Sequence, residues 1–329
     1  MKKFLNNLFF SGLFLFQLAV NADNEVKQAA QTQLPKIAEI KKISDKKYFC
    51  TVADAQYFRW LLNLIGSIHK SNYENLEEIA VYDIGFTDDQ RVFLRTIEKV
   101  SVNSVELTNK DLLKQFKTND QGKLVRGWYA WKPVTIKQAL DKFPYVLYLD
   151  AGCVVLKPLE DLFRYIQEHG YFLMQDQVWC IGGKDIQFKI GEHCTKYVLE
   201  KFKLNTSENS WILHAPNVYA AIQGLSKEKM YESYVLPTYE CTKDLRNFQD
   251  DGSGPYGFGW ARHDQTVYSI FARMLKLDVI EPHKDVELSA CGKKFKVRVS
   301  DYEPENPHIF YNCKGQKDFV DNIRFKPKA

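Results

Sequence analysis

Hydrophobic and polar residues follow two recurring patterns in the first half of the chain. Short runs rich in β-branched and aromatic residues predict strands at Tyr48–Ala53, Ile79–Asp83 and Ser104–Leu107. Apolar residues at helical spacing predict a helix over Gln56–Lys70. The run Tyr145–Leu149 is apolar on both faces, as expected of a strand inside a sheet. Strands that alternate with helices predict an α/β fold with a mostly parallel central sheet.

Two further helices are predicted from local signals. Thr87 followed by Asp88 and Asp89 is typical of a helix start, because a hydroxyl caps the first turn and carboxylates favour its positive end. The segment Trp128–Lys142 also has a helical pattern and directly precedes the apolar strand. Along the sequence, a helix is therefore expected before and after the second predicted strand and before and after the third.

The N-terminus has the features of a secretory signal. Lys2 and Lys3 precede the apolar stretch Leu8–Val20, and Ala22 fits a small-residue cleavage site. We expect a signal peptide over residues 1–22, a flexible polar leader over 23–45 and one domain over 46–329. The protein is then exported, to the lumen of the secretory pathway, to the outside, or to the periplasm in a bacterium. In the alternative, the segment stays uncleaved and anchors the protein in a membrane.

Composition narrows the possible classes of protein. The chain has 329 residues, of which 45% are hydrophobic, enough for a substantial core. Lys and Arg number 45 against 41 Asp and Glu, and no dense basic run is interleaved with aromatic residues. Nucleic acid is therefore not an expected partner.

Neither the cysteines nor one glycine motif predicts chemistry. The seven cysteines cannot all pair within one chain, and Cys50 and Cys153 stand in apolar strand-like runs, where buried structural thiols are expected. Gly252, Gly254 and Gly257 match a dinucleotide-binding pattern. They follow no predicted strand and open no predicted helix, so a glycine-rich loop is expected instead.

Three aspartates stand where predicted strands end. Asp54, Asp83 and Asp150 would share one edge of a parallel sheet, which is where such folds bind ligands. Each could instead cap a helix or shape a turn. For Asp150 a ligand is favoured, because the small residues Ala151 and Gly152 leave room beside it.

The segment around Asp150 also resembles a known family. LYLDAGCVVLKPLEDLF (147–163) is similar to the strand, DxD-type motif and helix of GT-A fold glycosyltransferases, especially family 8 and related nucleotide-diphospho-sugar transferases. Further segments agree in order: FCTVAD (49–54), AVYDIGFTDDQ (80–90), WYAWKPVTIKQAL (128–140), ARHDQTVYSIF (261–271) and HIFYNCKG (308–315). The resemblance implies a GT-A-like domain with a Rossmann-like sheet and a C-terminal extension on the acceptor side.

The resemblance also implies roles for particular residues. The nucleotide-sugar donor would contact Thr51, Ala53, Asp54, Asp83, Lys132, Asp150 and Lys314. Asp264 and Gln265 would lie near the transferred sugar, and His263 could serve as the base in place of Asp264.

Two alternatives are possible for metal dependence, because Gly152 stands where a DxD motif has its second aspartate. In one alternative, Asp150 and His308 hold Mn²⁺ or Mg²⁺ on the donor diphosphate, with water in the lost position. In the other, Lys132, Arg262 and Lys314 neutralise the diphosphate without a metal. We expect the first alternative.

The function implied is transfer of a sugar from a nucleotide-diphosphate donor to a hydroxyl group of a glycan, lipid or protein. The alternative is a binding module for sugars or nucleotides that has kept the fold and lost the chemistry. Gly152 is the main support for this alternative.

Overall fold

The computed structural model describes residues 43–117, 124–176, 179–181, 184–281, 286–300, 307–311 and 317–327. They belong to one compact unit, Ile43–Ala329. The expected signal peptide and nearly all of the expected leader lie outside the described residues. No helix among the described residues is long and apolar enough to cross a membrane.

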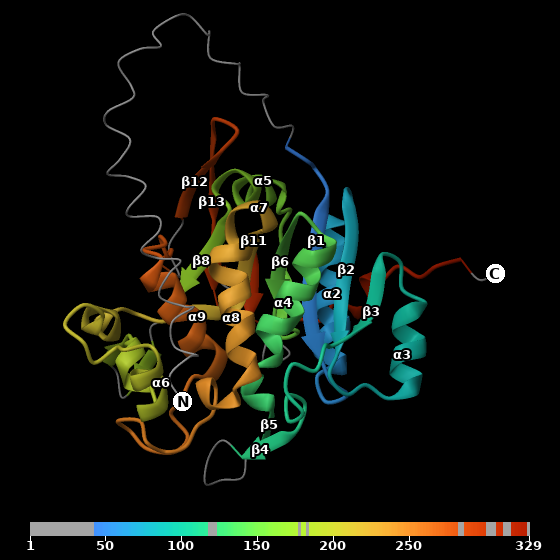
Figure 1. Cartoon of the computed structure of the whole chain (residues 1–329). Helices are drawn as coiled ribbons and strands as arrows, with labels where there is room; N and C mark the ends of the chain where they lie inside the picture. Colours follow the sequence, from blue (N-terminus) through green and yellow to red (C-terminus); the bar gives the residue numbers. More distant parts are fainter. Residues whose placement is uncertain are drawn as a thin grey trace, which may run out of the picture. The chain divides into compact units, whose positions relative to one another are not determined.

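A six-stranded sheet forms the centre of the unit (Figure 1). Its order is β3 (Val100–Ser104), β2 (Leu76–Asp83), β1 (Lys47–Ala53), β6 (Tyr145–Leu149), β11 (Val218–Ser226) and β8 (Tyr171–Gln175). The first four strands are parallel, and β11 runs antiparallel to both of its neighbours. The prediction of an α/β fold with a mostly parallel sheet is confirmed.

Helices cover both faces of this sheet. Neighbouring residues of β1 point to opposite faces: Phe49 packs its ring against Phe163 of α5, whereas the Cys50 thiol contacts the Thr135 carbonyl of α4. The helices are α2 (Phe58–Asn72), α3 (Asp88–Arg95), α4 (Trp131–Lys142), α5 (Glu160–His169), α6 (Lys196–Lys201), α7 (Lys227–Met230), α8 (Leu236–Glu240) and α9 (His263–Met274).

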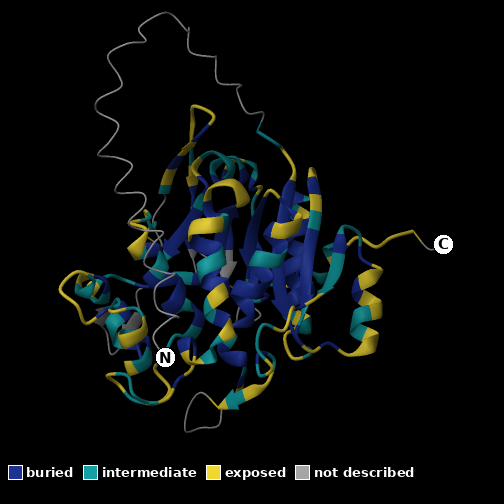
Figure 2. Ribbon diagram, in the orientation of Figure 1, coloured by how far each residue is buried: buried dark blue, intermediate teal, exposed yellow. Residues whose placement is uncertain are grey.

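Shorter strands lie outside the central sheet. They are β4 (Gln115–Lys117), β5 (Leu124–Arg126), β7 (Cys153–Val155), β9 (Trp179–Ile181), β10 (Lys184–Ile186), β12 (Val286–Ala290), β13 (Lys293–Val297), β14 (Val299–Ser300) and β15 (Ile309–Tyr311). Buried residues concentrate in the central strands and the faces of the helices against them (Figure 2). Cys50 and Cys153 are both fully buried, as predicted.

Two predicted elements differ from the structure. The third strand is Val100–Ser104, not Ser104–Leu107. It pairs residue by residue with β2, and the last pair joins Ser104 to Asp83, where β2 ends. Since β2 ends at that pair, the strand ends there, and the Gln138 side chain of α4 bonds to the Ser104 carbonyl and to Glu106 N instead.

The helix predicted from Trp128 begins only at Trp131. Gly127, Trp128 and Tyr129 instead form a turn with φ angles of 55°, 54° and 61°. These values belong to the left-handed region of backbone conformation, which residues other than glycine rarely adopt. Periodicity cannot distinguish this turn from the first turn of an ordinary helix.

Other local predictions are confirmed. Thr87 caps α3, and a capping box joins its side chain to Gln90. Gly252, Gly254 and Gly257 lie in an irregular segment with no helix opening within it. The prediction of a glycine-rich loop is confirmed.

Candidate functional site

Lys132, Asp150 and Asp264 meet at the carboxyl-terminal edge of the sheet. The Lys132 Nζ atom lies 3.0 Å from Asp150 Oδ1 and 2.9 Å from Asp264 Oδ2, and 3.2 Å from the Ala220 carbonyl oxygen. Lys132 is 3% exposed and Asp264 5%. The three residues, called the Lys132 cluster below, come from distant parts of the chain.

Local structure explains how each residue of the cluster is positioned. Asp150 follows β6 and is fixed by its N–H, which donates to the Ala221 carbonyl of β11, and by its own carbonyl, which accepts from Cys153 N. Lys132 stands in the first turn of α4 and Asp264 in the first turn of α9. A helix N-terminus favours a carboxylate, so α9 helps to stabilise the Asp264 charge.

The three oxygen neighbours of Lys132 equal the number of N–H groups that an ammonium can donate. Burial acts to lower the pKa of Lys132, but Asp150 and Asp264 outweigh it and raise the pKa above its ordinary value. The two carboxylates therefore favour the charged form of the lysine.

The two carboxylates of the cluster differ in environment. Burial raises the pKa of Asp264, with Lys132 opposing the rise and Asp150 adding to it. Asp150 is more open, with 27% of its side chain exposed, and its Oδ1 also accepts a hydrogen bond of 2.7 Å from the Tyr148 hydroxyl. Both contacts of Asp150 are made through Oδ1, so Oδ2 is the oxygen available to a ligand.

Asp54 and Asp83 lie at the same edge but shape turns there. Asp54 Oδ1 accepts from the backbone N–H groups of Gln56 and Tyr57. Asp83 Oδ1 accepts from the N–H groups of Gly85 and Phe86, and its Oδ2 lies 2.5 Å from Arg91 Nε. Burial alone would raise the pKa of Asp83, but Arg91 and the two backbone donors lower it.

Thr51 and Ala53 are 1% and 2% exposed in β1. The structure places them inside the strand, beneath the edge where Asp54 stands. The Thr51 hydroxyl has no hydrogen-bond partner among the described residues. Direct donor contacts of these two side chains stay a prediction.

His263 lies beside the left-handed turn. Its Nδ1 is 2.8 Å from the Phe248 carbonyl oxygen, and its ring centroid is 5.2 Å from that of Trp128 and 5.6 Å from that of Tyr129. His263 itself has a φ of 48°. Three non-glycine residues in the left-handed region thus contact one another, and such strain clusters at functional sites. Gln265 follows Asp264 in α9, partly buried.

His308 is placed away from the Lys132 cluster along β7. Its carbonyl accepts from Leu156 N, its Nδ1 accepts from Arg298 N, and the strand after it pairs Tyr311 with Cys153. Because Cys153 is the end of β7 next to Asp150, His308 stands at the other end of that strand. Lys314 lies outside the described residues, and Arg262 directly precedes α9.

Asp150 and His308 stand at opposite ends of β7, so the two residues do not fit one shared metal ion. No group of three His, Cys, Asp or Glu side chains that could hold one occurs among them. Asp150 has Lys132 and Tyr148 on one oxygen, and Gly152 offers no side-chain ligand. Asp150 would therefore supply one oxygen to a divalent cation, and water and the donor phosphates would supply the others.

Sequence reasoning missed Arg126 and Tyr148. The Arg126 guanidinium lies 3.5 Å from Asp54 Oδ2 and donates to the Leu113 carbonyl at 2.8 Å. A side chain built on Gly85 would approach Arg126 Nη2 to 3.2 Å, so the guanidinium lies over the ends of β1 and β2. The one feature of the sequence that could have indicated Arg126 is its position directly before Gly127.

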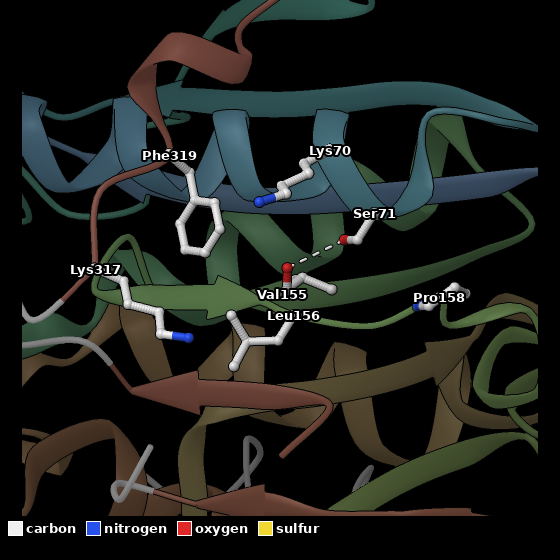
Figure 3. Close-up of a pocket in the computed structure, with 7 residues that line it drawn as sticks. All are labelled: Lys70, Ser71, Val155, Leu156, Pro158, Lys317 and Phe319. Carbon is white, nitrogen blue, oxygen red and sulfur yellow. Dashed lines mark hydrogen bonds between the residues drawn. The ribbon is translucent and has the colours of Figure 1, made fainter. Parts of the chain in front are cut away.

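A depression of about 420 Å³ lies elsewhere on the unit (Figure 3). It is lined by Lys70 and Ser71 of α2, by Val155, Leu156 and Pro158, and by Lys317 and Phe319 near the C-terminus. No member of the Lys132 cluster lines it. The ammonium of Lys70 lies over the Phe319 ring, and the Ser71 hydroxyl donates to the Val155 carbonyl.

Comparison with known proteins finds similarity only in three dimensions. No family model and no curated protein sequence matches the chain. Solved structures that resemble it are glycosyltransferases.

The glycosyltransferase GlyE of Streptococcus pneumoniae is 14% identical, with a TM-score of 0.38, over 72% of this chain and 45% of that one. The chain thus spans less than half the length of GlyE. The galactosyltransferase LgtC with donor and acceptor sugar analogues is 12% identical, with a TM-score of 0.41, over 71% and 73% of the two chains. The mannosyltransferase Ktr4p of S. cerevisiae in complex with GDP is 10% identical, with a TM-score of 0.46, over 91% and 83%. Similarities this low do not establish an activity for this chain.

Proposed function

We propose that this protein transfers a sugar from a nucleotide-diphosphate donor to a hydroxyl acceptor. The observation that carries the proposal is the Lys132 cluster at the carboxyl-terminal edge of a parallel sheet. It joins residues of three segments that separately resemble glycosyltransferase motifs. Two carboxylates beside one fixed cation suit a reaction in which positive charge develops on the sugar.

Lys132 acts in this proposal as a positioning residue. Its Nζ atom forms ion pairs with Asp150 and Asp264 and donates a hydrogen bond to the Ala220 carbonyl, so its charge is engaged by groups of the protein. It holds the two carboxylates at fixed positions, and its charge opposes the rise in the pKa of Asp264 that burial causes. Asp150 Oδ2 then faces the donor.

Asp264 is proposed to act at the transferred sugar, either as a base toward the acceptor hydroxyl or as a group that stabilises charge at the sugar carbon. His263 is the second candidate for the base. If its Nδ1 donates to the Phe248 carbonyl, the lone pair of the neutral ring is at Nε2. Inversion and retention are both compatible with these positions.

Arg126 is proposed to neutralise the leaving diphosphate. It is a charged group at the sheet edge, with 23% of its side chain exposed and its nearest carboxylate contact, to Asp54, as long as 3.5 Å. A guanidinium can donate two parallel hydrogen bonds to phosphate oxygens. We propose this role in place of a metal held by Asp150 and His308.

The test is release of nucleoside diphosphate from UDP-glucose, UDP-galactose and GDP-mannose by the full chain. We expect release with at least one donor, and a loss of about a hundredfold or more in Asp264→Asn and Arg126→Ala. Asp278→Asn and Arg59→Ala, which change exposed residues, are the matched controls. If no donor is hydrolysed with or without Mn²⁺, the protein is a binding module and the proposal fails.

Metal removal separates the two means of charge neutralisation. With Arg126 as the fixed cation, turnover in excess EDTA should equal turnover in Mn²⁺. Activity that disappears with EDTA and returns with Mn²⁺ would overturn the role of Arg126 while leaving glycosyl transfer in place.

A further inference from the structure

An exposed aromatic segment leads into the candidate site. Residues 248–262, here called the aromatic loop, connect the 3₁₀ turn at Leu245–Asn247 to α9 (Figure 1, in orange). Tyr256, Phe258 and Trp260 are 50%, 38% and 42% exposed. The rings of Tyr256 and Trp260 contact each other, with centroids 5.3 Å apart. Large aromatic side chains gathered in solvent mark a binding surface more often than a structural role.

The aromatic loop is held in one shape by a buried carboxylate. Asp250, which is 3% exposed, accepts hydrogen bonds from Gly252 N at 3.0 Å, Gly259 N at 2.7 Å and Ala261 N at 3.3 Å. Hydrogen bonds to a charged acceptor are stronger than neutral ones. The ring pair is therefore presented by an ordered backbone and does not collapse into the core.

Contacts outside the loop fix the orientation of the pair. The Tyr256 hydroxyl donates to Glu192 Oε1 at 2.9 Å, and the Trp260 carbonyl oxygen lies 2.7 Å from His193 Nδ1. Phe188 packs beside Trp260, with centroids 6.0 Å apart. A surface whose side chains are already ordered loses less entropy when it binds a ligand.

The two ends of the loop meet beside the Lys132 cluster. The carbonyl oxygen of Phe248, at the start of the loop, lies 2.8 Å from His263 Nδ1 at the start of α9. Asp264 follows directly and contacts Lys132. A molecule lying on Tyr256 and Trp260 is thus next to the segment that carries Asp264.

The chemistry of the pair suits a neutral sugar. A hexose ring has an apolar C–H face that packs on an aromatic ring and hydroxyl edges that need hydrogen-bond acceptors. Tyr256 and Trp260 supply the rings, and the Glu192 carboxylate supplies an acceptor beside them. This carboxylate disfavours anionic partners such as phospholipid surfaces.

From this arrangement we propose that Tyr256 and Trp260 form the platform for a neutral saccharide acceptor. The inference rests on the proposed function and adds the class of acceptor and the residues that select it. Phe258 stands on the same loop without a ring contact to the pair among the described contacts, so it is not assigned to the platform.

The test uses saturation-transfer difference NMR on the full chain with lactose, cellobiose, maltotriose and mannobiose, without donor. We expect signals on the C–H protons of at least one sugar. Trp260→Ala and Tyr256→Ala should each weaken its binding by about tenfold, as expected when an aromatic side chain at the centre of a binding surface is removed. Phe93→Ala, which removes a 38% exposed ring on α3, should bind as the wild type does.

Donor hydrolysis without acceptor is measured separately on the wild type, which separates this inference from the proposed function. Absence of donor hydrolysis by the wild type would refute the proposed function. The NMR result would still show whether Tyr256 and Trp260 bind a sugar. Equal sugar binding by wild type and Trp260→Ala, or no binding of any probe, would overturn the platform. So would sedimentation that shows a dimer of the wild type and a monomer of Trp260→Ala, because the pair would then bind a second copy.

Discussion

Lys132 is the residue on which the arrangement of the two site carboxylates depends. A buried ammonium between two carboxylates is stable only because each partner compensates the desolvation of the other. The ion pairs therefore say little about net stability, but removal of one partner leaves an uncompensated charge. This makes Lys132 a sensitive position in both stability and pH response.

Lys132→Met should lower the free energy of unfolding by about 3–5 kcal/mol near pH 7, because Asp150 and Asp264 lose their counterion. The pKa of Asp264, already raised by burial, should rise further. A carboxyl group with a raised folded pKa binds protons more tightly in the folded state, so stability is lost as pH rises through that pKa. Urea unfolding at several pH values should show a deficit that is smallest in acid.

The control for this prediction is Asp264→Asn in the Lys132→Met background. It removes the group that titrates, so the extra pH dependence should disappear. A deficit of the single variant that does not change with pH would contradict the assigned coupling between Lys132 and Asp264.

At the scale of elements, the left-handed turn Gly127–Tyr129 decides where α4 begins and where the aromatic rings beside His263 lie. The turn is locked by packing as well as by its backbone angles: Gly127 N donates to the Lys114 carbonyl at 2.7 Å. A Cβ atom added to Gly127 would lie 1.7 Å from the Leu112 carbonyl oxygen. The Leu112 backbone therefore leaves no room for a side chain at position 127, and only glycine fits there.

Gly127→Ala should destabilise the fold by several kcal/mol, roughly 3 or more, because strain in the left-handed region adds to a backbone clash. Gly257→Ala is the matched control. Its φ of 79° is also left-handed, but a Cβ there meets nothing within 4 Å. It should therefore cost only about 1 kcal/mol. Thermal unfolding of both variants gives the comparison, and equal losses would show that the contact with Leu112 does not matter.

For the whole molecule, two buried histidines set the response to acid. Burial lowers the pKa of His69 to about 4 and that of His193 to about 4, from an ordinary value of 6.5. His69 Nδ1 accepts from Arg324 N, which joins α2 to the C-terminal segment, and His193 Nδ1 contacts the Trp260 carbonyl of the aromatic loop. Protonation of His69 at Nδ1 would break the first of these contacts.

Stability should fall as pH decreases from about 6.5 to about 4, because in this window the unfolded chain binds protons that the folded chain excludes. Each histidine contributes at most roughly 3 kcal/mol to this loss. His69→Gln should reduce the slope of unfolding free energy against pH, as measured by urea titration. The same slope in His69→Gln and wild type would refute a role for this residue.

Local sequence patterns determined much of the framework. The capping box at Thr87, the strand Tyr145–Leu149 and the burial of Cys50 could be read from neighbouring residues alone. Each depends on periodicity or on a hydrogen bond within one turn, so the surrounding fold does not have to be known. The parallel sheet followed from the order of these elements, which also placed three aspartates at one edge.

Tertiary structure decided what those aspartates and their neighbours do. Asp54 and Asp83 are engaged by backbone N–H groups, whereas Asp150 shares Lys132 with Asp264, more than a hundred residues away in sequence. Arg126 is held at the edge by Asp54 and the Leu113 carbonyl, and His308 is positioned by its hydrogen bond to Leu156. The sequence by itself thus determined which residues carry charge and where strands end. Their partners depend on distances between remote segments, which no local pattern encodes.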